Sequence, residues 1–357
     1  MIAPDDLTKY APVWKKPDSG IATQFDMRGV EDLGLLKIDF LGLRNLDVIT
    51  DCVELIEKRH GVVVEPLQFD LGDVPTYELL SESKTVGVFQ LEGTQMRALL
   101  RRLKPTCFEE LAAVLALYRP GPMAQNMHND FADRKNGEQE IEYFHPDAAD
   151  LLSETYGLMI YQEQLMAVAQ KFAGYTLAEA DNLRKACGKK LPEVMEKERD
   201  KFESAVIVNG YEPELAVDLF DMIAGFADYA FNASHAFGYA MISFQTAYLK
   251  CHYPAEYFTA LLTSVQSDHI RLSVYLTEAR RQGFELLSPD INLSQRTFYP
   301  IDDHTIIFGF LAIKNIGEPP AQSIISERET NGPFESFFDF ASRCDAKATN
   351  KKAVDSL

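Results

Sequence analysis

The stretch FGYAMISFQTAYLKCHYP, residues 237–254, has the composition of a largely buried helix. Proline lacks the backbone N–H that an interior helical position needs, so Pro254 predicts the end of this helix. A second stretch, YQEQLMAVAQKFAGY at residues 161–175, has the same character and predicts another largely buried helix. These two segments are typical of a mainly helical protein.

Further helix signals extend over most of the chain, from about residue 75 to residue 290. Thr106 with Glu109 and Thr176 with Glu179 fit the capping box, in which the two side chains satisfy free backbone donors at a helix start. The sequence YRPGP at residues 118–122 predicts a helix stop followed by a rigid turn.

The first 60 residues are expected to change from strand to helix. Loops and short strands are predicted for residues 1–33. Residues 35–41 alternate with a period of two, which predicts a strand ending at Gly42. The next segment, residues 44–61, carries apolar residues at helical spacing and predicts a helix that stops at Gly61.

The composition of the chain changes again near residues 288–300, and this is the best internal domain boundary. Short strands are predicted for the segments TFYPI and TIIFGF, and the pattern of residues 311–328 is again typical of a helix. The fold class expected for the whole chain is therefore mainly α with a small α+β part.

The composition limits the possible functions. The chain has 357 residues with a formal net charge of −19. It exceeds the size at which single cores stop growing, so two or more domains are expected. Its overall field should repel polyanions, and phosphate binding would need local basic clusters. Five scattered cysteines indicate neither disulfides nor a thiolate zinc site, and no membrane-spanning run is present, so a soluble protein of a reducing compartment is expected.

Lys37 and Asp39 are two charges inside the apolar stretch GLLKIDFLGL, residues 34–43. On a strand they would share one face, about 6.5–7 Å apart at Cα. A carboxylate at a strand end is a common Mg²⁺ ligand, but two-metal chemistry needs further acidic residues. Spacing alone favours the alternative, a solvated ion pair.

Two basic clusters are candidates for phosphate binding. Arg97, Arg101 and Lys104 share one helix face, and their alternative is a solvated surface. The second cluster surrounds a helix end at Gly188, where cations also favour the helix dipole for structural reasons. Its members are Arg184, Lys185, Lys189 and Lys190.

Two further segments carry candidate residues. IKNIGEPPAQSII, residues 313–325, suggests a helix–hairpin–helix that offers backbone N–H groups to a phosphate, against the alternative of an ordinary helical turn. Asn315 replaces the usual first hairpin glycine, and it tolerates positive φ well for a non-glycine residue. His235, in FNASHAFGYA, is by default a core or capping histidine.

Several stretches taken together resemble one family, the C-family replicative polymerases that include the alpha subunit of bacterial DNA polymerase III. They occur in family order and span essentially the whole chain. Among them are LGLLKIDFLGLRNL, VGVFQLEGTQM, LALYRPGPM, ETYGLMIYQEQLM, AGYTLAEADNLRKACGKK, FNASHAFGYAMISFQTAYLKCHYPAEYF and FGFLAIKNIG.

The resemblance implies that the chain is an internal segment with three parts. Residues 1–44 would be the end of the palm, residues 45–290 the helical fingers, and residues 291–357 the start of the helix–hairpin–helix DNA-binding region. Asp39 would be the third of three palm aspartates that hold two Mg²⁺ ions, the other two lying outside this chain. Lys37 would face the incoming triphosphate.

The resemblance also implies contacts in the fingers and with DNA. Arg184 and Lys185 match two adjacent arginines that contact the triphosphate, although Lys185 loses the bidentate fork. Asn232 and His235 match the family, whereas Ala233 stands where lysine is usual. The nucleotide contacts would be Lys37, Arg184, Lys185, Lys189, Lys190, Asn232 and His235, and the DNA contacts Arg97, Arg101, Lys104, Arg119, Lys314, Asn315 and Gly317.

The function implied is templated nucleotidyl transfer from deoxynucleoside triphosphates onto primer-template DNA. The partners would be the rest of the polymerase subunit and, through missing regions, the sliding clamp and other replisome subunits, in the bacterial cytoplasm and without a membrane. One palm aspartate cannot assemble a two-metal site, so the isolated chain is expected to be inactive. The alternatives are a DNA- and nucleotide-binding module without chemistry, and a helical scaffold with incidental basic clusters.

Overall fold

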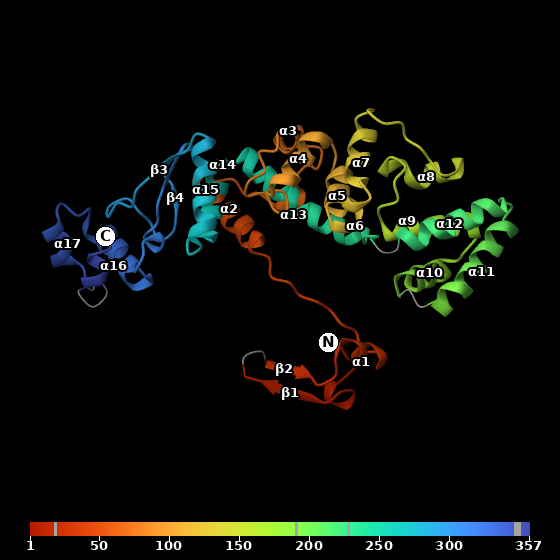
Figure 1. Ribbon diagram of the computed structural model, residues 1–357. Helices are drawn as coiled ribbons and strands as arrows, with labels where there is room; N and C mark the ends of the chain where they lie inside the picture. The colour runs from red at the N-terminus through yellow and green to blue at the C-terminus, as the bar shows by residue number, and fades with distance from the viewer. Residues whose placement is uncertain (18–19, 190–191, 227–228, 346–350) are drawn as a thin grey trace. The chain divides into compact units, whose positions relative to one another are not determined.

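The computed structural model describes residues 1–17, 20–189, 192–226, 229–345 and 351–357 (Figure 1). The chain divides into two compact units, Met1–Arg44 and Asn45–Leu357, and each is described by itself.

The first unit is built on a small β-hairpin. β1 (Val13–Lys16) and β2 (Gly20–Thr23) pair antiparallel, with Val13 opposite Thr23. A 3-10 turn, η1 (Leu7–Lys9), precedes them, and α1 (Met27–Asp32) follows. The buried core of this unit is small and consists of Ala11, Val30 and Leu35.

The strand predicted for residues 35–41 is wrong. Only Leu36 forms a bridge, by mutual backbone hydrogen bonds with Ile2 at 2.8 and 3.2 Å. Among the described residues no other backbone pairs with the stretch as a strand would, and Phe40 is 95% exposed. A period-two pattern forms a strand only where a neighbouring strand accepts its hydrogen bonds.

The second unit is mainly helical, which confirms the fold class expected from the sequence. Its helices before the first strand are α2 (Arg44–His60), α3 (Val74–Ser81), α4 (Thr94–Leu103), α5 (Phe108–Leu117), α6 (Pro120–Ala124), α7 (Met127–Lys135), α8 (Ala149–Leu152), α9 (Gln162–Ala173), α10 (Leu177–Lys189), α11 (Pro192–Val208), α12 (Pro213–Phe226), α13 (Ala233–His252), α14 (Pro254–Ser264) and α15 (His269–Arg281). Shorter 3-10 turns are η2 (Pro66–Gln68), η3 (Pro146–Ala148) and η4 (Ser153–Thr155).

The long helix α13 is the centre of the largest core cluster, as its apolar sequence predicts. It packs against α5 and α3 (Figure 1). Ala240, Phe244 and Ala247 on α13 are fully buried in this cluster. The helix ends at His252, and Pro254 begins α14 instead of continuing α13. The prediction for residues 237–254 is therefore confirmed.

A second helical cluster joins α9, α10, α11 and α12, which lie side by side in Figure 1. Its centre is aromatic, with Phe172, Phe202 and Phe220 almost completely buried. α9 ends at Gly174, which has φ +66°. This packing fixes the position of α10, which carries the candidate nucleotide contacts Arg184 and Lys185.

The two predicted capping boxes differ in outcome. The Thr176 and Glu179 pair is confirmed, because the Glu179 carboxylate accepts the Thr176 N–H at 3.0 Å and the Thr176 hydroxyl accepts the Glu179 N–H at 3.3 Å. The Thr106 and Glu109 pair is wrong. Glu110 accepts the Thr106 N–H at 2.7 Å instead, and its other oxygen accepts the Tyr156 hydroxyl at 2.6 Å.

The C-terminal part contains the predicted short strands. β3 (Glu285–Leu287) pairs parallel with β5 (Thr305–Ile307), which pairs antiparallel with β4 (Tyr299–Pro300). The 3-10 turn η5 (Phe310–Ala312) leads to α16 (Glu318–Asn331), α17 (Phe337–Arg343) and α18 (Lys351–Val354).

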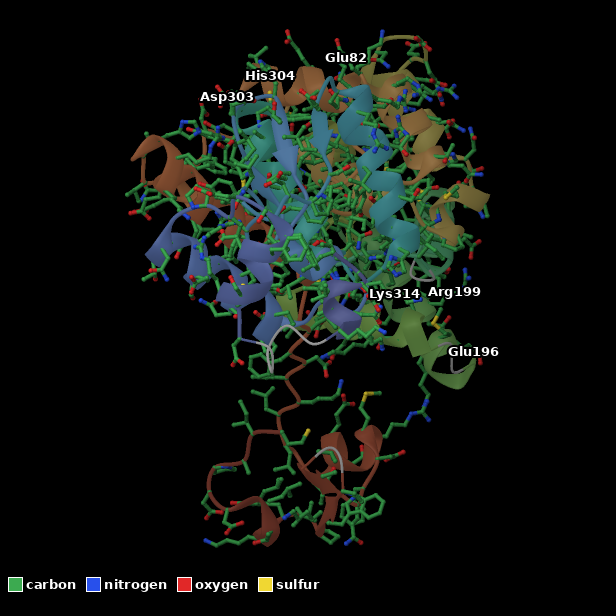
Figure 2. All side chains as sticks on the ribbon, turned by 90° about the vertical axis from the view of Figure 1, so that its left-hand side faces the viewer. Glu82, Glu196, Arg199, Asp303, His304 and Lys314 are labelled. Atoms are coloured by element: carbon green, nitrogen blue, oxygen red, sulfur yellow. The ribbon has the colours of Figure 1, made fainter. Side chains whose placement is uncertain are left out.

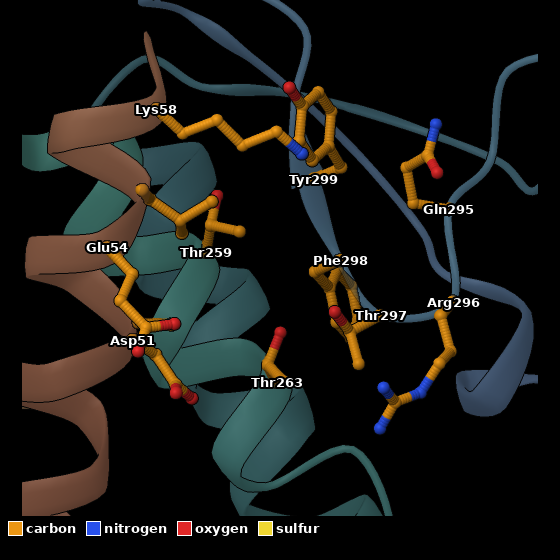
Figure 3. A pocket seen from close by; sticks show the side chains of 12 residues that line it. Asp51, Glu54, Lys58, Thr259, Thr263, Gln295, Arg296, Thr297, Phe298 and Tyr299 are labelled. Carbon is orange, nitrogen blue, oxygen red and sulfur yellow. The ribbon is translucent and has the colours of Figure 1, made fainter. Parts of the chain in front are cut away.

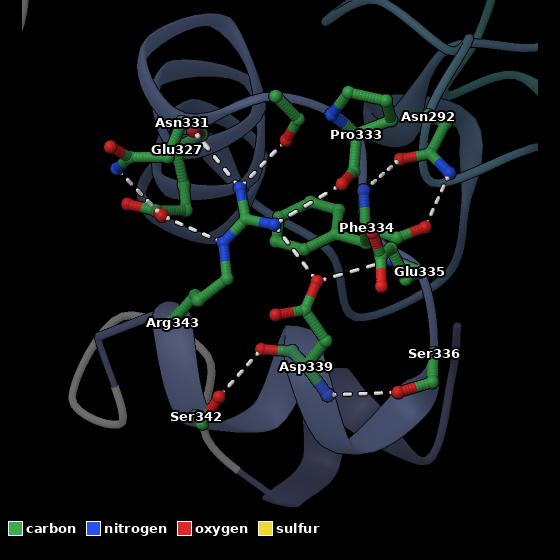
Figure 4. A network of polar contacts seen from close by, with 11 residues as sticks. Asn292, Glu327, Asn331, Pro333, Phe334, Glu335, Ser336, Asp339, Ser342 and Arg343 are labelled. Atoms are coloured by element: carbon green, nitrogen blue, oxygen red, sulfur yellow. Dashed lines mark hydrogen bonds and ion pairs between the residues drawn. The ribbon is translucent and has the colours of Figure 1, made fainter.

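Arg343 fixes the turn between α16 and α17 (Figure 4). Its guanidinium donates to the Glu327 carboxylate at 3.0 Å, to the Asp339 carboxylate at 2.8 Å and to the Gly332 carbonyl at 2.7 Å. The guanidinium also lies 4.5 Å from the centre of the Phe334 ring. The planar fork thus holds both helices and their connecting loop in one arrangement.

A cleft of 520 Å³ lies between α2, α14 and residues 295–299 (Figure 3). Its walls carry both charges, including Asp51 and Lys58 from α2 and Arg296 opposite. Burial, with Glu54 and Asp47 nearby, raises the pKa of Asp51. None of the candidate site residues lines this cleft.

Among the described helices, none is both long and apolar enough to cross a membrane.

Candidate nucleotide site

Lys37 and Asp39 lie in the first unit and contact each other. The Lys37 ammonium is 2.6 Å from an Asp39 carboxylate oxygen, and the two side chains are 34% and 77% exposed. Such an exposed pair contributes little to stability. Both side chains therefore stay accessible to a ligand that competes for either charge.

Asp39 alone does not fit a two-metal centre. Two ions need several carboxylate oxygens in one place. Within the part of the chain that the structure describes, no group of three or more His, Cys, Asp or Glu side chains could hold a metal ion. Among the described residues, Asp39 is therefore a lone candidate ligand and not part of a complete metal site.

The second unit places Arg184 and Lys185 together on α10. Arg184 donates from Nε and Nη2 to one Asp181 oxygen, at 3.0 and 2.8 Å. The Lys185 ammonium is 2.7 Å from the other Asp181 oxygen. Hydrogen bonds from Lys185 and Arg184 lower the pKa of Asp181. The Asp181 carboxylate thus binds both predicted triphosphate contacts, Arg184 and Lys185.

Two members of the same basic cluster are not placed. Lys190 and the side chain of Lys189 lie outside the described residues. They remain predictions from the sequence.

α13 begins close to the start of α9. Asn232 caps α13, because its side-chain oxygen accepts the His235 N–H at 2.8 Å. Its amide nitrogen donates to Glu163 Oε1 at 3.0 Å, and the Ala233 N–H donates to Glu163 Oε2 at 3.0 Å. The His235 ring packs against Phe231, with 5.3 Å between ring centres.

α9 therefore connects the two groups of candidate residues. Gln162, its first residue, accepts a hydrogen bond from Arg184 Nη1 at 3.3 Å. Glu163, its second residue, holds the start of α13. The backbones also pair, with the Gln162 N–H donating to the Phe231 carbonyl at 2.8 Å. Arg184, Lys185, Asn232 and His235 thus belong to one polar cluster.

Glu163 and Asp181 were missed by the sequence reasoning. Asp181 binds two cations, whereas Glu163 accepts from a side-chain amide and from a backbone N–H that is 70 residues away. The available signal for Asp181 was its place in the motif ADNLRK, close to Arg184 and Lys185, whereas Glu163 in the motif YQEQ had no predicted phosphate contact beside it.

Arg119, a predicted DNA contact, supports the same region from inside. It donates to the Tyr229 carbonyl at 2.7 Å and to the Ala116 carbonyl at 2.8 Å, and its guanidinium lies 4.1 Å from the centre of the Phe231 ring. Burial lowers its pKa. Its described contacts hold the segment before α13.

The basic face of α4 is partly engaged with its neighbours. Arg97 donates to the Ser83 carbonyl at 3.0 Å, and Arg101 donates to the Ser83 hydroxyl at 2.7 Å. Lys104 is exposed and has φ +51° at the end of the helix. Arg101 and Lys104 can reach a surface ligand.

The hairpin residues lie before α16. Lys314 is exposed and is labelled in Figure 2. Asn315 has φ +70°, which confirms the expected left-handed conformation, and its amide donates to the Ser356 hydroxyl at 3.2 Å. Gly317 is the N-cap of α16, and Ala321 and Ile324 face the core. The element before the hairpin is the single turn η5.

Comparison with known families gives three matches along the chain. Residues 45–210 match the bacterial DNA polymerase III alpha subunit finger domain. Residues 283–357 match a helix-hairpin-helix motif, and residues 1–42 match the bacterial DNA polymerase III alpha NTPase domain.

Three relatives that match over the whole of this chain carry the same name. The chain is 47% identical to the DNA polymerase III subunit alpha of Mycobacterium tuberculosis strain H37Rv, over all of this chain and 30% of the relative. The relatives of the same name in Aquifex aeolicus and Escherichia coli K12 are 43% and 41% identical, with 31% and 32% of their length covered. The chain thus spans about a third or less of the length of these relatives.

Proposed function

The chain belongs to the family of bacterial DNA polymerase III alpha subunits, and we propose that it is part of an enzyme that copies DNA by templated nucleotidyl transfer. In this proposal residues 1–44 end the palm, residues 45–290 form the fingers and residues 291–357 begin the DNA-binding region. The observation that carries the proposal is the polar cluster in which α9 joins Arg184 to the start of α13.

The nucleotide is held by cations of the fingers. Arg184 and Lys185 leave Asp181 and bind the triphosphate, and they neutralise the charge that develops on the leaving pyrophosphate. Asn232 and His235 lie at the edge of the same cluster. Finger motion that brings this cluster onto a correctly paired nucleotide would select the substrate by induced fit.

The first unit supplies a carboxylate and a cation. Lys37 binds the triphosphate, and Asp39 becomes a ligand for Mg²⁺ in the whole protein. The described residues of this chain do not form a two-ion site, so the remaining metal ligands would come from other parts of the whole protein.

DNA is bound through phosphates. The hairpin with Lys314, Asn315 and Gly317 offers backbone N–H groups and one cation at the start of α16, which suits sequence-independent binding of duplex. Arg101 and Lys104 add exposed positive charge, with Arg97 beside them, and Arg119 supports the fingers from inside. The rest of the subunit, the sliding clamp and other replisome subunits complete the assembly in the cytoplasm.

A second candidate applies to the chain alone, a DNA- and nucleotide-binding module that carries out no chemistry by itself. It rests on the resemblance, which matches Asp39 alone to a palm metal ligand, whereas two-metal chemistry needs further acidic residues.

The catalytic role of Asp39 is testable in a chimaera in which this chain replaces the matching segment of the Mycobacterium tuberculosis relative. Asp39→Asn removes the charge that a metal ion needs, so primer extension is expected to fall by at least about 10³-fold while primer-template binding stays unchanged. Asp32→Asn, at an exposed position in α1, is the matched control. Normal extension by the Asp39→Asn chimaera would exclude the proposed role.

A further inference from the structure

Glu163 occupies a special position in the polar cluster. Its two carboxylate oxygens accept separate hydrogen bonds, from the Asn232 amide and from the Ala233 N–H, both at 3.0 Å. Both donors belong to the start of α13, a helix of 20 residues. A carboxylate is stabilised there because free N–H groups and the helix dipole favour negative charge.

Gln162, the residue before Glu163, makes the other contacts that join α9 to α10 and to the segment before α13. Gln162 accepts the Arg184 guanidinium at 3.3 Å and donates its backbone N–H to the Phe231 carbonyl. The Phe231 N–H in turn donates to the Ile160 carbonyl at 3.2 Å. The first two residues of α9 therefore touch α10 on one side and α13 on the other.

We propose that Glu163 is a positioning residue, which through α9 sets the place of Arg184 relative to the first turn of α13. This inference rests on the proposed nucleotide site. Glu163 acts through its neighbours and does not itself contact the nucleotide. It keeps the triphosphate-binding arginine at a fixed separation from Asn232, the N-cap of α13, and from His235 in the first turn of that helix.

The carboxylate cannot be replaced by an amide without loss. The Asn232 oxygen is committed to the His235 N–H, so its amide nitrogen faces Glu163 as a donor. In E163Q one acceptor oxygen becomes a donor, and two donors then face each other. Adding Asn232→Asp turns the facing donor into an acceptor and restores the complementary pairing, with the total charge unchanged.

The first test follows the Arg184 Nε–H signal by ¹⁵N NMR in the full chain. E163Q is expected to shift or broaden this signal, and the double variant E163Q/N232D to restore it. E140Q, at an exposed position in a loop, is the matched control and should leave the signal unchanged. A contact that only stabilises the fold would lower the melting temperature of E163Q without moving the Arg184 signal. An unchanged Arg184 signal in E163Q would overturn the proposal.

The second test titrates the full chain with inorganic triphosphate and follows the heat of binding. E163Q is expected to weaken binding by about 3- to 10-fold, and E140Q to leave it unchanged. If the unsubstituted chain binds no triphosphate, the proposed nucleotide site fails, and the NMR test still decides the positioning role. If the unsubstituted chain binds and E163Q binds equally well, the positioning role is refuted.

Discussion

Asp181 controls how much positive charge Arg184 and Lys185 present to a ligand. It accepts from both cations, so a triphosphate that binds them must displace a carboxylate already in place. Asp181 is 32% exposed, Arg184 27% and Lys185 57%, so solvent weakens these contacts and a polyanion can compete with them. We therefore expect Asp181 to reduce nucleotide affinity at the proposed site without blocking it.

Removing this carboxylate gives the first prediction. Asp181→Asn is expected to tighten binding of inorganic triphosphate by about 2- to 5-fold, because one repulsive charge near the phosphates is lost. Calorimetric titration of the full chain measures the change. Asp200→Asn, on the exposed surface of α11, should have no effect. Weaker binding by the Asp181 variant would show that the carboxylate mainly holds the two cations in position.

At the scale of elements, the loop between α3 and α4 depends on a buried lysine of α13. Lys250 donates to the Lys84 carbonyl at 2.7 Å and to the Val86 carbonyl at 2.8 Å, and Glu278 of α15 lies 3.7 Å away. Its side chain is 3% exposed. Burial lowers the pKa of Lys250 to about 8, although Glu278 acts in the opposite direction.

This lowered pKa predicts the pH dependence of folding. Between about pH 8 and pH 10.5 the unfolded chain binds more protons at this position than the folded chain, so its contribution to the free energy of unfolding rises with pH. Below about pH 8 both states are protonated and the contribution is constant. Urea unfolding of the unsubstituted chain and of Lys250→Met across this range measures the difference between them.

The free energy of unfolding of the unsubstituted chain, minus that of Lys250→Met, should increase with pH. Lys197→Met is the control, since Lys197 is exposed on α11 and should add no such slope. A difference that is constant from pH 8 to pH 10.5 would show that Lys250 keeps its ordinary pKa in the folded state.

The helices were predictable because their signals are local. α13 is marked by its apolar run and by Pro254, and α9 by its composition and Gly174. The strand predicted for residues 35–41 does not form, because a period-two pattern becomes a strand only where a partner backbone lies beside it. The capping box at Thr106 failed for a similar reason, since Glu110 is also held by the distant Tyr156.

For the whole molecule, the sequence identified the basic half of the site more readily than the acidic half. Arg184 and Lys185 stand out in an acidic chain and match the family. Asp181 and Glu163 were overlooked among 54 acidic residues, because their roles depend on which helices meet. Local clusters also explain how a chain of net charge −19 can have phosphate-binding surfaces.

In the proposed function, the cluster on α9, α10 and α13 binds the incoming nucleotide. The most direct measurement is the KM for deoxynucleoside triphosphate in primer extension by the chimaera with the Mycobacterium tuberculosis relative. Arg184→Ala is expected to raise this KM by about 10- to 100-fold, because a charge-assisted contact with phosphate is lost. Arg199→Ala, which removes an arginine that pairs with Glu203 and Asp221, should leave the KM within about twofold of the parent value. An unchanged KM for the Arg184→Ala chimaera would contradict the assignment of the nucleotide site.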